Sequence, residues 1–112
     1  ARNVRGLSLN NIRFEVSSPD LRPALVFENV SDATIHALAA QADTKAEAVC
    51  RITGARDILL SGSRVLTAAA AFVKVIGPDN ERITIDGGDI SKAAKPVVFT
   101  GGASPKAVKV RI

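Results

Sequence analysis

The sequence has no methionine, tryptophan or tyrosine, and its 4 aromatic residues are all phenylalanine. Proteins that bind single-stranded nucleic acid stack bases on exposed aromatic side chains, so this composition argues against nucleic-acid binding. The single cysteine, Cys50, excludes an internal disulfide and a cysteine-based metal cage within one chain. The longest apolar run, Ala68–Val73, is far too short to cross a membrane.

Positive charge is in slight excess, because 15 Lys and Arg stand against 11 Asp and Glu for a net charge of +4. The two signs are interspersed along the chain, so no single-sign block marks a groove for nucleic acid. A mild excess still favours an anionic partner such as an acidic polysaccharide. With 112 residues, 46% of them hydrophobic, the chain is expected to form one folded domain over residues 1–112.

A repeat of about 25 residues runs through the whole sequence. Short segments with apolar first and third residues begin at positions 7, 33, 58, 83 and 108, so their starts are separated by 26, 25, 25 and 25 residues. This alternation places the first and third residues on one face of a half-buried strand. The segments are Leu7–Leu9, Ala33–Ile35, Ile58–Leu60, Ile83–Ile85 and Val108–Val110. Each is followed by a polar residue on the outward face: Asn10, His36, Ser61, Asp86 and Arg111.

Each repeat also contains a second strand-like stretch and one further inward position. The second stretches are Ala24–Phe27, Val49–Ile52, Phe72–Val75 and Val97–Phe99. The further inward positions are Phe14, Ala40, Val65 and Ile90. Turn residues separate the strands, among them Ser17–Asp20, Gly62–Ser63, Gly87–Gly88 and Gly101–Gly102.

Two other folds are compatible with parts of this pattern. A leucine-rich repeat needs an Asn or Cys at a fixed place after each strand, but Asn11 is followed by Ala37, Gly62 and Gly87 at the equivalent positions. A helix is favoured by alanine content over residues 33–48 and 67–71, so a helical excursion in one coil is compatible with the sequence. The pattern as a whole predicts an all-β, right-handed parallel β-helix of four to five coils.

Three phrases fall within the repeats: Arg22–Val30, Val49–Ile52 and Phe72–Pro78. They resemble the last coils of polygalacturonase-like proteins, which belong to glycoside hydrolase family 28 among the pectin-lyase-like β-helices. The resemblance implies a C-terminal segment of a longer, secreted or periplasmic protein that degrades pectic polysaccharides. The catalytic elements of that family are incomplete here: Arg51-Ile52-Thr53 and Arg82-Ile83-Thr84 each lack the final Lys of Arg-Ile-Lys, and no Asp-Asp or Gly-His-Gly occurs.

No residue is therefore assigned a catalytic, cofactor-binding or metal-binding role. An inverting glycosidase needs two carboxyl groups across its substrate, and Asp86 is the only acid in its outward column. We expect Asp86 and Asp89 to serve in turns or in an ion pair with Arg111. We expect His36 to be a surface residue and Cys50 to be buried. Asp20 and Arg22 are expected to fix their loop by hydrogen bonds, with binding of an acidic sugar as the alternative.

Two functions remain open at this stage. One is a non-catalytic C-terminal β-helix segment of a polygalacturonase-like hydrolase, so whether the parent protein is an enzyme is uncertain. The other is a structural or adhesive β-solenoid without activity, of the tail-spike or surface-protein kind. In both, the first coil exposes strand edges. The expected partners are preceding coils of a longer chain or a second copy bound at the N-terminal edge, with no nucleic acid, membrane or cofactor.

Overall fold

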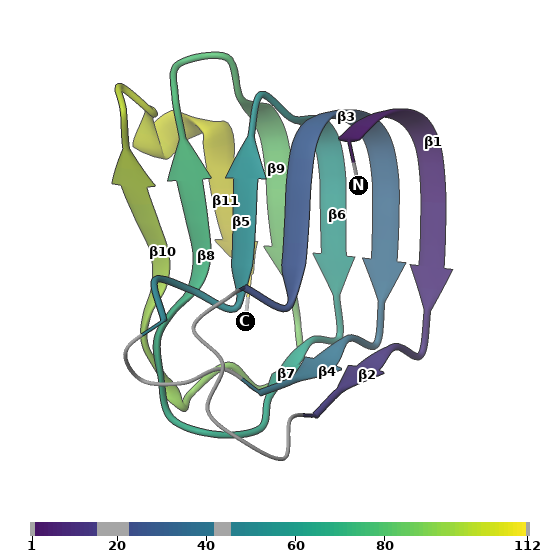
Figure 1. Cartoon of the computed structure of the whole chain (residues 1–112), viewed down its shortest axis with the longest axis vertical. Coiled ribbons are helices and arrows are strands. Elements are labelled where there is room, and N and C mark those ends of the chain that lie inside the picture. The colour runs from purple at the N-terminus through teal and green to yellow at the C-terminus, as the bar shows by residue number, and fades with distance from the viewer. Residues whose placement is uncertain (1, 16–22, 42–45, 112) are drawn as a thin grey trace.

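The protein is a parallel β-solenoid of about four turns, as the repeat predicts (Figure 1). The computed structural model describes residues 2–15, 23–41 and 46–111. Coils follow one another from the purple first coil, at one end of the stack, to the yellow last coil at the other. The described chain folds into β1 (Arg2–Asn10), β2 (Arg13–Phe14), β3 (Leu25–His36), β4 (Ala39–Ala40), β5 (Cys50–Thr53), β6 (Arg56–Ser61), β7 (Arg64–Val65), β8 (Ala69–Ile76), β9 (Glu81–Asp86), β10 (Ala93–Thr100), η1 (Pro105–Ala107) and β11 (Val108–Arg111).

The 25-residue spacing becomes the strand register. Ile35 pairs with Leu9 on one side and Leu60 on the other, and Leu60 pairs in turn with Ile85. Ile35, Leu60 and Ile85 are each 0% exposed, so the column forms a dry interior. Removing one such side chain from water contributes about 1.5–3 kcal/mol, which makes this column a main source of stability.

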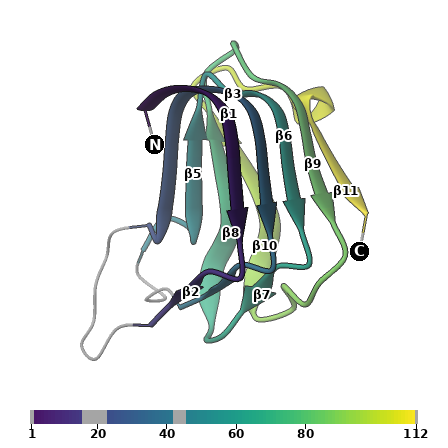
Figure 2. The same cartoon turned by 90° about the vertical axis from the view of Figure 1, so that its right-hand side faces the viewer.

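A second inward column faces the first across the interior. It runs through β10, β8, β5 and the first part of β3, and Figure 2 shows β5, β8 and β10 on the side of the coil opposite β6 and β9. Phe27 pairs with Ile52 and Ile52 pairs with Val75, and all three are at most 1% exposed. Cys50 and Val73 are buried as expected for the second stretch, whereas the expected inward residues of its end coils, Leu25, Val97 and Phe99, are partly buried against the core.

The third side of each coil is a short sheet in the order β2-β4-β7. Phe14 pairs with Ala40, and Ala40 pairs with Val65, which confirms the stacking expected for these positions. Ala40, Val65 and Ile90 are buried at 5% exposure or less. This sheet closes the bottom of the coil in Figure 1.

The corner after the second stretch is the separate turn that the sequence indicates in the later coils, where β5 and β6, β8 and β9, and β10 and β11 are distinct strands, but not in β3. In β3 the chain bends while the strand continues, because Asn29 and Asp32 adopt positive φ angles of 52° and 58°. Val30, between them, points into the interior and is 0% exposed. Asp57 and Arg82 repeat the bend in later coils, with φ angles of 57° and 51°.

The helical alternative is wrong for the described part of the alanine-rich segments. Residues 33–36 and 39–40 lie in β3 and β4, and residues 69–71 lie in β8. Pairing with neighbouring coils satisfies the backbone and buries Ala40, Ala69 and Ala71, so tertiary packing overrides helix propensity. Among the residues described, helix is confined to the 3₁₀ turn η1. Residues 42–45, and the turn expected at Ser17–Asp20, lie outside the described residues.

The Gly87–Gly88 turn gives a direct test of how closely the coils approach. A Cβ atom on Gly88 would lie 2.6 Å from the Ser63 nitrogen and closer still to its carbonyl oxygen, whereas one on Gly87 would meet nothing within 4 Å. Both glycines have positive φ, 68° at Gly87 and 88° at Gly88.

We expect Gly88→Ala to lower the free energy of unfolding by about 3 kcal/mol, because it adds a backbone clash to the strain of a positive φ. The matched variant Gly87→Ala should cost only about 1 kcal/mol. Urea unfolding followed by circular dichroism measures both. Equal losses of stability in the two variants would show that the coil containing Gly88 does not meet the preceding coil at Ser63.

Candidate functional site

The outward face of β1, β3, β6, β9 and β11 is a continuous surface of five paired strands that could hold a ligand. The strand register brings together one polar residue near the end of each strand, as the sequence predicts. These residues are Asn10, His36, Ser61, Asp86 and Arg111. Parallel neighbours in such a sheet are about 4.8 Å apart, so a chain-like ligand could contact several of them. The chemistry available depends on which of these groups are already engaged.

Asp86 is engaged by a neighbouring cation. Arg111 donates a hydrogen bond from Nη2 to Asp86 Oδ2 over 3.3 Å. The register neighbours of Asp86 are Ser61 and Arg111, and Thr84 lies two residues earlier on the same face. None of these three supplies the second carboxyl group that an inverting glycosidase requires.

Asp89 has the turn role that the sequence indicates. Its Oδ1 accepts hydrogen bonds from the Ser91 nitrogen at 3.1 Å and from Ser91 Oγ at 2.6 Å. These bonds favour the charged carboxylate and hold the pKa of Asp89 below its usual value. Ser91 is a partner that sequence reasoning missed, although Asp-x-Ser is a familiar signal for such a turn.

The lone histidine and the lone cysteine lie in different walls of the coil, His36 in the part of β3 that pairs with β6 and Cys50 in β5. His36 is exposed on the outward face, as expected. Cys50 is 1% exposed in the interior, where burial raises the pKa of its thiol to about 12. The thiolate is the nucleophilic form, so this cysteine is held unreactive at neutral pH.

We expect the Cys50 thiol to resist a small aromatic disulfide reagent in native buffer and to react at the rate of a free thiol in denaturant. The ratio of the two rates should exceed about 10³, since reaction requires the coil to open. Absorbance of the released thiolate follows the reaction. Rapid stoichiometric labelling of the native protein would contradict burial of β5.

A polar network on the outer face of β5 and β8 was not found by sequence reasoning. Glu47 accepts hydrogen bonds from Lys74 Nζ at 2.9 Å and from Arg51 Nη1 at 3.2 Å. The bond to Lys74 is the largest cause of a lowered pKa for Glu47. Arg51 and Lys74 are register partners in adjacent coils, so the carboxylate bridges two like charges that stacking brings together.

This network predicts acid sensitivity. A carboxyl group whose pKa is lower in the folded state adds stability above its unfolded pKa, near 4.5, and this stability is lost as the pH falls through the folded value. Glu47→Gln should therefore lower the free energy of unfolding by up to about 1 kcal/mol at neutral pH, a half-exposed pair being partly screened. At pH of about 2 the variant and the parent should be equally stable. Urea titrations at the two pH values test this, and a difference that is independent of pH would contradict it.

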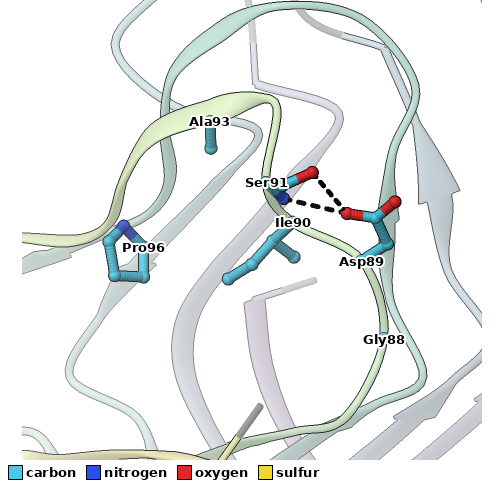
Figure 3. A pocket seen from close by; sticks show the side chains of 6 residues that line it. All are labelled: Gly88, Asp89, Ile90, Ser91, Ala93 and Pro96. Carbon is cyan, nitrogen blue, oxygen red and sulfur yellow. Dashed lines mark hydrogen bonds between the residues drawn. The ribbon is translucent and has the colours of Figure 1, made fainter.

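A pocket of about 480 Å³ opens at the end of the stack beside β10. Figure 3 shows Ile90, Ala93 and Pro96 around its apolar part, and Asp89 with Ser91 at its polar side. The Asp89 carboxylate is already occupied by Ser91, so the pocket offers a small apolar surface beside one charged group. The 25-residue spacing does not predict this pocket, because its shape depends on the path of the chain between β9 and β10.

The remaining sequence candidates, Asp20 and Arg22, lie outside the described residues. Across residues 2–15, 23–41 and 46–111, no group of three or more His, Cys, Asp or Glu side chains is placed to hold a metal ion. Over the same ranges, no helix has the length and apolar character needed to cross a membrane.

Comparison with known proteins adds no relative to this description. The chain matches no protein-family model, no curated protein and no solved structure. The fold is therefore established from the chain's own coordinates, and its function must be argued from the surfaces described above.

Proposed function

We propose that this chain is a structural β-solenoid segment whose role is to stack against other coils and not to catalyse a reaction. The observation that carries the proposal is the exposure of interior positions in the first coil. Leu7 and Leu9 are only partly buried, whereas their register partners Ala33 and Ile35 are 1% and 0% exposed. Apolar side chains left in water at the end of a stack favour contact with a further coil.

The free edge of β1 is the surface through which such stacking would occur. Among the described strands, β1 pairs only with β3, so its other edge carries unpaired backbone groups. Edges of this kind bind other strands. The partners proposed for it are a preceding coil of a longer chain or a second copy of this one.

A second candidate function is the one implied by the sequence resemblance: a non-catalytic C-terminal segment of an exported, polygalacturonase-like hydrolase. Features of β10 favour a terminal position in a solenoid. Lys95 is in register with Ala71, which is 1% exposed, and Pro96 lies within the strand. A charge in an inward column and a proline both disfavour the addition of another strand. The cations of this coil also fit an acidic polysaccharide as ligand.

The structural role is tested by incubating the chain with polygalacturonate and measuring new reducing ends. We expect no release above that of a sample without protein, because Asp86 has no carboxylate partner on its face. Asp86→Asn serves as the control and should behave identically. Turnover that Asp86→Asn abolishes would overturn the proposal. For the second candidate, the deciding observation is a parent reading frame with paired aspartates and Gly-His-Gly in upstream coils.

A further inference from the structure

The two ends of the solenoid differ in charge. Residues 90–112 contain no Asp or Glu but hold five cations, so the interspersed charge expected from the sequence does not extend to the last coil. These cations are Lys92, Lys95, Lys106, Lys109 and Arg111. In contrast, the segment Leu7–Asn10 at the edge of β1 has no charged residue and no proline.

This difference disfavours stacking of the last coil of one copy on the first coil of another. The first coil presents Arg2, Arg5 and Arg13, so that contact would bring cations against cations. Glu28 and Glu15 already pair with Arg2 and Arg13 respectively, which leaves Arg5 without an ion pair among those the structure gives. On the opposite side, Lys95 and Pro96 obstruct the addition of a strand to β10.

When the uncharged edge of β1 meets itself, it meets no proline and no lysine, and Arg5 is the one arginine of each first coil without an ion pair among those the structure gives. We propose that Leu7–Asn10 pairs with the same segment of a second copy, in an antiparallel arrangement with Ser8 opposite Ser8 of that copy. This inference rests on the stacking role proposed above and specifies its partner. The contact is isologous, so it closes a dimer and does not propagate into a filament.

Side-chain alternation determines the register of this pairing. Leu7 and Leu9 belong to the inward column, whereas Ser8 and Asn10 are exposed on the outward face. Residues directly opposite each other in an antiparallel pair lie on one face, so an inward residue must meet an inward residue. Centring on Ser8 places Leu7 opposite Leu9 of the second copy, twice by symmetry. Centring on Leu9 would instead place Leu7 opposite Asn11.

Single-cysteine cross-linking in the full chain distinguishes the arrangements. Opposed side chains have Cβ atoms about 4.5–5.5 Å apart, within the range that a disulfide bridges with a small adjustment. Under oxidised glutathione we expect Ser8→Cys to form a covalent dimer by itself and Lys109→Cys to remain monomeric. The native Cys50 is buried and should not contribute. A product that appears only when Ser8→Cys and Lys109→Cys are mixed would show head-to-tail stacking and overturn the inference.

Light scattering after size exclusion provides the second measurement, and it does not depend on oxidation. We expect the parent chain to have about twice the monomer mass of 11.7 kDa. Ser8→Lys should return it to the monomer, because two ammonium groups would oppose each other across the two-fold axis. Thr34→Lys, exposed one coil further along the same column, should leave the dimer intact. A monomeric parent chain would refute this inference alone, whereas turnover of polygalacturonate would refute the proposed function.

Discussion

Exclusion of water between coils is the constraint on which the rest of this structure depends. No coil can bury its own apolar face, so each relies on the coil before and the coil after it. Leu60 shows the result, since its register partners Ile35 and Ile85 enclose it and none of the three is exposed. At the ends of the stack the same columns open to solvent, and Val110 is 37% exposed. Full burial in the middle and partial burial at the ends follow from one geometry.

The sequence predicts this geometry well because two periods coincide. Alternation identifies strands, and the spacing of about 25 residues identifies which strands pair, so the sequence alone aligns Leu9, Ile35 and Leu60 as the structure does. Local conformation was harder to predict. Ala37 has a positive φ of 62°, and Asn11, Gly62 and Gly87 at the equivalent positions also have positive φ angles. Nothing in the residue type of alanine signals this conformation. Alanine favours helix in isolation, and only pairing between coils makes Ala39 and Ala40 strand residues here.

The outward surface shows why repeats are more informative about fold than about function. Stacking brings side chains 25 residues apart into contact, and ion pairs such as Asp86–Arg111 and Glu47–Lys74 connect successive coils. Exposed pairs contribute little stability, but they occupy groups that would otherwise be available to a ligand. The most informative features are therefore the first and last of the described coils, whose strands pair on one side only among the strands described. The two ends differ as contact surfaces. One end carries Lys95 and Pro96, which obstruct strand addition, and the other carries the uncharged segment Leu7–Asn10.

The central claim is that residues one repeat apart lie side by side in parallel register. Nuclear Overhauser effects between backbone protons of an isotopically labelled sample test it most directly, since they require protons to be within about 5 Å and adjacent strands meet that condition. The account predicts contacts linking Ile35 to Leu60 and Leu60 to Ile85, with the outward residues of the same strands in matching register. Contacts confined to near neighbours in sequence, or a set displaced by one residue, would contradict it.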